Sequence, residues 1–291
     1  MQTLPAPTIV QLIQGSPEWL DYRREKRNAS ETAAVMGLSP WSTPYRLWLE
    51  KTGKVTTTPN AAMRHGSALE PAARAAYEDQ TGLVMQPLVL QAGDYSASLD
   101  GMTLEGDLVL EIKCPVRGSR SDLWQDVSAG EVPPYYLVQV QHQLMVSGAA
   151  QAHLWVFDGT RGILCGIERD EGFMQQIQNA WDEFQGHLDA DTPPPLCEGD
   201  TVLRQDAAWT AAASTFMQAK QAADAAADRQ EEARRALLAL ATHPREQGAG
   251  LSVTRYWRSG NVDYKKVPAL VGLNLTPWRV KGREEVRVVV G

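Results

Sequence analysis

The sequence predicts an α/β fold, in which a mixed central β-sheet is flanked by helices and followed by a C-terminal helical and small β extension. Three observations carry the general class. Amphipathic helical and short β-rich segments alternate over roughly the first two thirds of the 291-residue chain. A proline run at 193–195 then interrupts the pattern, and an alanine-rich stretch without glycine or proline follows at 205–242. The hydrophobic content of 43% is sufficient for a full core.

Capping residues place the helices of the N-terminal part. Ser16 and Ser30 are typical N-cap residues, and Gly37, Gly53 and Gly82 are typical of the position just after a helix. Helices are therefore expected over residues 16–27, 30–37, 43–52 and 61–80.

The pattern then changes to short β-rich runs separated by turn residues. Strands are expected over residues 83–91, 95–101, 108–113, 150–158 and 162–169. Helices are expected between and after them, over residues 119–130, 135–148 and 171–190. Because helices and strands are interleaved in this way, the sheet is expected to be mixed rather than purely parallel.

Three regions are expected along the chain. Residues 1–192 form the core, residues 193–249 a proline-rich linker with an alanine-rich helical segment, and residues 250–291 a small basic β-rich module. No sustained heptad is evident in the alanine-rich segment, so a helix or a helical pair is favoured over a coiled coil.

Composition excludes several classes of protein. The three cysteines form no CxxC pair, which argues against a disulfide framework, a structural zinc site and an iron–sulfur cluster. No membrane span or signal peptide is expected, so a cytoplasmic location fits best. The net charge is −7, yet residues 250–291 carry eight Lys or Arg against three Asp or Glu, and a second basic cluster lies at 23–27. Local basic patches of this kind leave nucleic-acid binding open.

The strand at 108–113 contains two charged residues, Glu111 and Lys113, on one face. They are expected to lie roughly 6–7 Å apart along the strand. A tight turn brings Asp100 beside Glu111, and two adjacent carboxylates repel each other unless a cation lies between them. A hard divalent ion such as Mg²⁺ takes ligands of this kind, and the Lys113 ammonium could orient or deprotonate a water or balance transition-state charge.

Each of these residues also has an ordinary structural explanation. Glu111 and Lys113 could be a surface ion pair, and the Asp-Gly before them a common turn. Glu70, just before Pro71, could be a solvated helix charge. Gln139 is expected to share one side of a helix with His142 and Gln143, which could contact phosphate or metal-bound water or be simply a polar helix face.

Four motifs in order resemble a known family: GSPEWLDYRREKRNASETAAVMGLSPW, RHGSALEPAARAAYE, SLDG…LEIKCP and YYLVQVQHQLMVSG. Together, over roughly residues 14–190, they resemble the YqaJ-type viral recombinases, a lambda exonuclease-like group of the PD-(D/E)XK nucleases. This resemblance implies that the sheet and its helices form a restriction-endonuclease-like core. The resemblance implies that Asp100, Glu111 and Lys113 are the catalytic triad, with Glu70 and Gln139 assisting. It also implies that the metal, Mg²⁺ with Mn²⁺ as a substitute and two ions in all, is held by Asp100, Glu111, the Ile112 carbonyl and Glu70.

The resemblance further implies a pocket for the 5′-phosphate of a DNA end. Arg23, Ser30 and Ser98 match the arginine and serines of that pocket. Its last arginine is matched by Arg120 or by Arg117, because the segment after Pro115 is one residue longer than expected.

The implied function is Mg²⁺-dependent 5′-to-3′ exonuclease digestion of double-stranded DNA ends, which leaves 3′ single strands for phage-type recombination in a bacterial host. The implied partners are double-stranded DNA ends, a single-strand annealing protein and further copies of the chain in a trimeric ring. A structure-dependent DNA endonuclease of the same fold and a non-catalytic DNA-binding recombination scaffold are the two alternatives.

Overall fold

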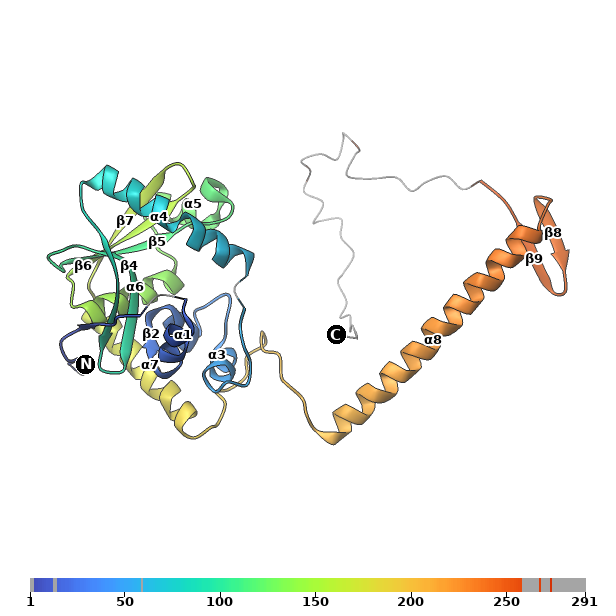
Figure 1. Cartoon of the computed structure of the whole chain (residues 1–291), viewed down its shortest axis with the longest axis horizontal. Coiled ribbons are helices and arrows are strands. Elements are labelled where there is room, and N and C mark those ends of the chain that lie inside the picture. Colours follow the sequence, from blue (N-terminus) through green and yellow to red (C-terminus); the bar gives the residue numbers. More distant parts are fainter. Residues whose placement is uncertain (1–2, 13–14, 59, 258–266, 268–272, 274–291) are drawn as a thin grey trace. The chain divides into compact units, whose positions relative to one another are not determined.

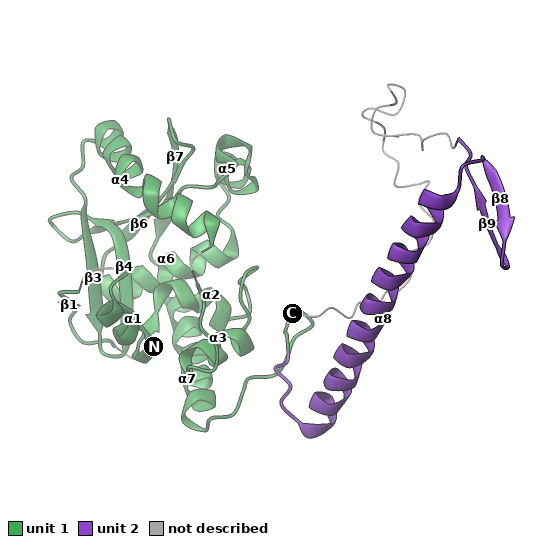
Figure 2. Cartoon of the chain, turned by 45° about the vertical axis from the view of Figure 1, so that its right-hand side comes forward, with its two compact units in different colours: residues 1–201 green, residues 202–291 purple. Residues whose placement is uncertain are grey.

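The structure is a computed structural model that describes residues 3–12, 15–58, 60–257, 267 and 273. The chain divides into two compact units, residues 1–201 and residues 202–291 (Figures 1 and 2). The predicted basic module at 250–291 lies largely outside the described residues.

The first unit contains a mixed sheet whose strands follow the order β1-β3-β4-β5-β6-β7 (Figure 1). β2 lies off this path, parallel to the beginning of β4, and β5 and β6 are also parallel. The other neighbours are antiparallel. The strands are β1 (Thr8–Ile9), β2 (Arg27–Asn28), β3 (Gln86–Ala92), β4 (Tyr95–Met102), β5 (Leu108–Lys113), β6 (Gln151–Phe157) and β7 (Gly162–Glu168). The predicted α/β class with a mixed sheet is confirmed.

Helices cover both faces of the sheet. One face packs against α6 and α7 in the larger apolar cluster, which includes Val109 and Leu154. The other face packs against α4 in a smaller cluster, which includes Leu110 and Trp155. The helices of this unit are α1 (Pro17–Glu25), α2 (Thr32–Val35), α3 (Pro44–Lys51), α4 (Ala61–Thr81), α5 (Asp122–Ser128), α6 (Pro134–Ser147) and α7 (Glu171–Asp189), with 3₁₀ turns η1 (Ala29–Glu31) and η2 (Gly118–Arg120).

Capping explains several helix boundaries. The side chains of Ser16 and Asn60 accept hydrogen bonds from main-chain N–H groups in the first turns of α1 and α4. Gly82 and Gly148 end α4 and α6 in the left-handed conformation, which a residue with a side chain adopts only at a cost. The helices that carry Glu70 and Gln139 therefore begin and end close to where the sequence predicts.

The second unit contains one long helix, α8 (Ala207–Leu240), and a hairpin of β8 (Arg245–Gly248) and β9 (Leu251–Thr254). The hairpin begins before residue 250, so the predicted start of the β-rich module falls within its turn. None of the residues of α8 is buried. No helix in the described part of the chain is long and apolar enough to cross a membrane.

Candidate active site

The candidate site lies where β4 and β5 separate. The two strands pair only at Gly101 with Leu110 and at Met102 with Val109. Beyond that point β5 continues beside β6, while the same edge of β4 is next paired by β2 at Tyr95 and Ser96. The main-chain groups between these pairings are open to other partners, so polar side chains can take the place of a strand there.

Asp100 stands at the point of separation. In the register of the last two pairs, it would be the residue facing Glu111. The pairing of β4 with β3 shifts by one residue here, because Leu99 and Met102 of β4 oppose Leu88 and Gln86 of β3. A bulge of this kind redirects the side chains of the bulged strand. The strand edge and the bulge together aim the Asp100 carboxylate into the opening.

The Asp100 carboxylate accepts a hydrogen bond that a neighbouring strand would otherwise accept at this edge of β5. Its Oδ2 accepts a hydrogen bond of 2.7 Å from the Ile112 N–H. Since the N–H and C=O of one strand residue point to the same edge, the Ile112 carbonyl also faces the opening. Asp100 and the Ile112 carbonyl, two of the predicted metal ligands, are thus brought to one place.

Close packing at Gly101 keeps this geometry. A Cβ added at Gly101 would lie 2.7 Å from the Met85 Cβ and 3.3 Å from the Leu110 Cβ. Both distances are shorter than normal carbon–carbon contacts. A side chain at this position would therefore push β4 away from β5 beside Asp100.

The Glu111 carboxylate is fixed by two amides from α6. Gln139 Nε2 donates to Oε1 at 2.7 Å, and Gln143 Nε2 donates to Oε2 at 2.6 Å. The two glutamines are four residues apart and so lie on the same side of the helix. Glu111 is almost fully buried, at 3% exposure. These bonds hold a buried carboxylate in one orientation, as is needed when its oxygens must meet a metal or a water.

Lys113 pairs with Glu111, as expected for two residues on one strand face. Its Nζ lies 2.5 Å from Glu111 Oε1 and donates to Gln139 Oε1 at 3.3 Å. Nζ also lies 4.7 Å from the centre of the Tyr136 ring. Burial acts to lower the pKa of Lys113, but the charges of Glu111 and Asp100 and the Tyr136 hydroxyl outweigh it and raise the pKa above its usual value. The ammonium keeps its charge, and one of its three N–H donors remains for a further partner.

Glu70 reaches the site through Arg74, one helical turn along α4. Arg74 Nη2 pairs with Glu70 Oε1 at 2.6 Å, and Arg74 Nε donates to the Asp100 carbonyl at 2.7 Å. α4 is itself attached to the sheet by a 2.9 Å bond from Trp155 Nε1 to the Ala73 carbonyl. Arg74 therefore couples the predicted third carboxylate to β4.

The site carries more negative than positive charge. Within the described part of the chain, the cations that pair with these acids, Asp100, Glu111 and Glu70, are Lys113 and Arg74. Burial, followed by repulsion from Glu111 and from Glu70, raises the pKa of Asp100 well above its ordinary value. One negative charge is left uncompensated when all three acids are ionised, and a bound cation would relieve it.

The donor set suits a hard divalent cation. Carboxylate and carbonyl oxygens are the ligands that Mg²⁺ prefers, and it keeps several waters beside one or two carboxylates. Over the described residues, no group of three or more His, Cys, Asp or Glu side chains is arranged to hold a metal ion. A site built from Asp100, Glu111 and the Ile112 carbonyl does not need a third acidic side chain, and the oxygen atoms that these residues bring to one opening fit such an ion.

Two of the residues predicted to bind a 5′-phosphate are in contact. Arg23 Nη2 donates to Ser30 Oγ at 3.0 Å and pairs with Glu31 Oε1 at 3.1 Å. Lys51 Nζ pairs with the other oxygen of Glu31 at 2.7 Å. Lys51 is buried and also donates to the Arg23 and Lys26 carbonyls, so its three N–H donors are engaged. The Arg23 guanidinium and the exposed Ser30 hydroxyl are therefore the groups of this cluster that remain for an anion.

The remaining predicted phosphate residues are not joined to this pair. The Ser98 carbonyl accepts a hydrogen bond from Gln143 Nε2 at 3.3 Å. Arg117 and Arg120 are exposed, at and within η2, just after β5. In the described residues no hydrogen bond or ion pair links Ser98, Arg117 or Arg120 to Arg23 or Ser30. Which arginine completes the pocket stays a prediction.

The chain is similar to known proteins over the part that contains this site. Residues 18–150 match the model of the YqaJ-like viral recombinase domain, and we call this matched region the YqaJ-like domain. It contains Asp100, Glu111, Lys113, Glu70 and both glutamines that bind Glu111.

The relatives of the YqaJ-like domain include one curated protein and solved exonuclease structures. The uncharacterized protein YqaJ of Bacillus subtilis is 29% identical over 198 residues, which cover 65% of this chain and 61% of that protein. The crystal structure of an alkaline exonuclease (LHK-Exo) from Laribacter hongkongensis matches with a TM-score of 0.51 and 27% identity, over 60% of this chain and 94% of that chain. LHK-Exo in complex with dAMP matches with a TM-score of 0.50 and 26% identity, over the same shares of the two chains. The chain therefore spans less than two thirds of the curated relative, and its core shares the fold of these exonucleases.

Sequence reasoning missed two site residues of the YqaJ-like domain and misplaced one. Arg74 follows Glu70 by four residues, a spacing that could have indicated their ion pair. Gln143 was grouped with Gln139, but its bond to Glu111 was not foreseen. His142 was expected on the same side and is not there. It is fully buried on the other side of α6, where Nδ1 lies 2.7 Å from Thr32 Oγ1, and burial lowers its pKa to about 3.

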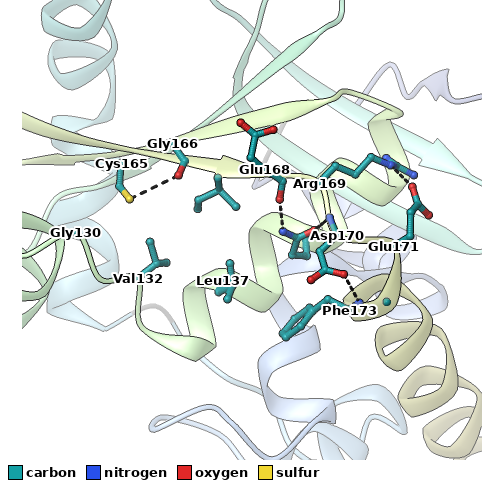
Figure 3. A pocket seen from close by; sticks show the side chains of 13 residues that line it. Gly130, Val132, Leu137, Cys165, Gly166, Glu168, Arg169, Asp170, Glu171 and Phe173 are labelled. Atoms are coloured by element: carbon teal, nitrogen blue, oxygen red, sulfur yellow. Dashed lines mark hydrogen bonds and ion pairs between the residues drawn. The ribbon is translucent and has the colours of Figure 1, made fainter.

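A pocket of about 690 Å³ lies outside this site (Figure 3). It is lined by the β7–α7 connection and the start of α6 and contains none of the predicted site residues. Its polar groups already bond one another: Gln141 joins the Glu168 carbonyl to the Asp170 N–H, and Arg169 pairs with Glu171. It offers no chemistry that competes with the carboxylates of the YqaJ-like domain.

Proposed function

We propose that the protein is a Mg²⁺-dependent 5′-to-3′ exonuclease that digests double-stranded DNA from its ends. The observation that carries the proposal is the set of acidic and basic side chains at the opening between β4 and β5. Asp100 adjoins Gly101, where the pairing of β4 with β5 ends, and lies close enough to Glu111 for the two charges to repel each other; Lys113 contacts Glu111. Phosphodiester hydrolysis requires an activated water and stabilisation of negative charge on the transferring group, and this set has groups for both.

Each side chain has a proposed task. Asp100, Glu111 and the Ile112 carbonyl would hold the ion, with Glu70 near a second one. When bound, the ions would supply a nucleophilic water at neutral pH and neutralise charge on the phosphate. Gln139 and Gln143 keep the Glu111 carboxylate in place. Lys113 directs its remaining N–H toward the attacking water or a phosphate oxygen.

The exonuclease proposal is favoured over an endonuclease by the Arg23–Ser30 pair. The Arg23 guanidinium beside the exposed Ser30 hydroxyl suits a terminal phosphate, because arginine binds such groups with two parallel hydrogen bonds. The similar alkaline exonuclease has been crystallised in complex with dAMP. A nucleoside monophosphate is the product that end-directed hydrolysis of DNA would release here.

Digestion of end-labelled linear duplex with and without Mg²⁺ tests the proposal. We expect release of mononucleotides from the 5′-terminated strand only when Mg²⁺ is present, and no cutting of closed circular duplex. Digestion from the 3′ end would contradict the polarity, and cutting of circles would support the endonuclease. If DNA is bound but remains intact at every metal concentration, the non-catalytic scaffold is correct instead.

A matched pair of lysine variants locates the chemistry. Lys113→Ala should reduce the rate on the order of 10² or more, as expected when a charge-stabilising donor is lost. Lys220→Ala removes an exposed lysine of α8 that pairs with Asp224 and should leave the rate unchanged. Equal rates for the two variants would remove Lys113 from the mechanism.

A further inference from the structure

The long helix α8 exposes several large apolar side chains. Four of them, Trp209, Phe216, Leu237 and Leu240, are 54%, 41%, 39% and 77% exposed. A fifth, Met217, is 50% exposed and lies outside the stripe that these four share. A helix of 34 residues is about 51 Å long. Alanine is abundant in it, so the helix is stable without help from packing. Its large apolar residues therefore need an explanation other than helix formation.

These four residues lie on a single stripe. Beginning at Trp209 and advancing alternately by three and four residues, the series passes through Phe216 and Leu237 and ends at Leu240. Gln230 is the one polar residue in it, and alanines fill the other positions. We call this stripe the α8 seam. Its spacing is that of the a and d positions of a coiled coil, and small alanines at these positions conceal it from a simple hydrophobicity pattern.

The α8 seam is complementary to itself when two copies run antiparallel. With the helix ends aligned, Leu237 of one copy faces Ala212 of the other, and Phe216 faces Ala233. Large side chains meet small ones in these layers, and Ala223 meets Ala226 at the centre. Interdigitation of large and small residues is what allows two helices to pack closely.

Charge favours the same arrangement. In a parallel pair, Arg229 beside the seam of one helix would face Arg234 of the other, twice in each dimer. The antiparallel pair separates these arginines. Arg234 lies at the height of Thr215 and Arg229 at the height of Lys220, in each case on opposite sides of the seam. The helix carries four basic and four acidic residues, so it has no net charge to attract nucleic acid.

The contact area is sufficient for a specific interface. A stripe about 10 Å wide along a helix of about 51 Å covers roughly 500 Å² on each copy, or roughly 1,000 Å² in total. That value reaches the range in which specific protein interfaces begin. An isologous pair also needs no second kind of surface, since the same seam serves both partners.

We propose that α8 is a dimerisation helix, and that its seam packs antiparallel against the α8 seam of a second copy of this chain. This inference does not depend on nuclease activity. It assigns a role to an element that carries none of the predicted catalytic residues.

Two glutamate substitutions in the full-length protein test the seam. Ala223→Glu places a charge at the centre of the seam and should weaken self-association at least tenfold. Ala225→Glu places the same charge two residues further along the exposed helix, outside the seam, and should leave it unchanged. The measurement is molar mass against concentration by sedimentation or light scattering. Equal masses for the two variants at every concentration would overturn the proposal. The comparison remains valid if another part of the chain forms an oligomer of its own, because both variants would share that oligomer.

Engineered cysteines test the direction of the helices. The exposed Cys197 is first replaced by Ser; Cys114 and Cys165 are partly buried. Ala212→Cys combined with Leu237→Cys should give a disulfide-linked dimer on mild oxidation. The two positions are about 37 Å apart on one helix, so the bond must join two copies. Either cysteine alone should give no dimer. Dimers from both single variants would indicate parallel helices, and no dimer from the double variant would exclude the pairing.

Discussion

Replacing Asp100 with Asn should stabilise the metal-free protein while abolishing its activity. Asn retains an oxygen to accept the Ile112 N–H and removes one of the three acidic charges at the site. Two like unit charges roughly 5–8 Å apart repel by roughly 2–3 kcal/mol at an effective dielectric constant of about 20. Attraction of Asp100 to Lys113 offsets part of this repulsion, which leaves a gain of about 1–2 kcal/mol.

The gain has a defined pH dependence. The pKa of Asp100 in the folded protein lies above its ordinary value of 3.8, so the folded state binds this proton more strongly than the unfolded state does. The free energy of unfolding therefore falls as the pH rises from the ordinary value through the raised one. The advantage of Asp100→Asn should be greatest at neutral or higher pH and should vanish below the ordinary pKa, where the aspartic acid is protonated in both states.

Thermal unfolding of the wild type and the variant in EDTA, and again with Mg²⁺, measures this effect. For a unit of this size, 1–2 kcal/mol corresponds to a rise in Tm of about 2–8 °C at neutral pH. Mg²⁺ at one hundred times its Kd should stabilise the wild type by about 2.7 kcal/mol and so raise its Tm. It should have little effect on the Tm of the variant. Asp94→Asn, which changes an exposed aspartate in the turn before β4, is the matched control. A variant that melts at or below the wild-type temperature in EDTA, or that responds equally to Mg²⁺, would refute the reasoning.

Three further predictions concern the clamp on Glu111, the phosphate pocket and the packing of the sheet. Gln143→Leu leaves one oxygen of the buried Glu111 carboxylate without a donor, so the rate of digestion should fall on the order of 10- to 100-fold while the affinity for DNA is unchanged. An unaltered rate would show that Gln139 alone is sufficient to hold the carboxylate. Arg23→Ala should reduce the preference for a 5′-phosphorylated end over a 5′-hydroxyl end, measured as a ratio of rates, whereas the adjacent exposed Arg24→Ala should preserve the ratio. Gly162→Ala would place a Cβ 2.1 Å from a ring carbon of the buried Trp155 and should lower the free energy of unfolding, measured in urea, by about 1–3 kcal/mol. Gly166→Ala lies on the same strand, where nothing is within 4 Å of the added Cβ, and should lower it far less.

The sequence was most informative where local rules operate. The bounds of α4 and α6 follow from caps and from glycines in the left-handed conformation, which depend only on neighbouring residues. The alternation of side chains along a strand likewise determines that Glu111 and Lys113 share a face, and the structure places their charged atoms 2.5 Å apart. The resemblance of the ordered motifs to YqaJ-type proteins agrees with the family match over residues 18–150.

Other parts of the site depend on contacts between distant segments. Sequence spacing could not show that β4 and β5 separate after Gly101, because strand separation depends on which strands compete for the same edge. It could not show that Gln143 turns toward the sheet while His142 turns away toward Thr32, since both lie on one helix and differ only in what packs around them. The residue types at the site were therefore determined by the sequence alone. The charge imbalance around Asp100 was decided by tertiary structure, because it arises only when α4, β4, β5 and α6 bring their side chains to one opening.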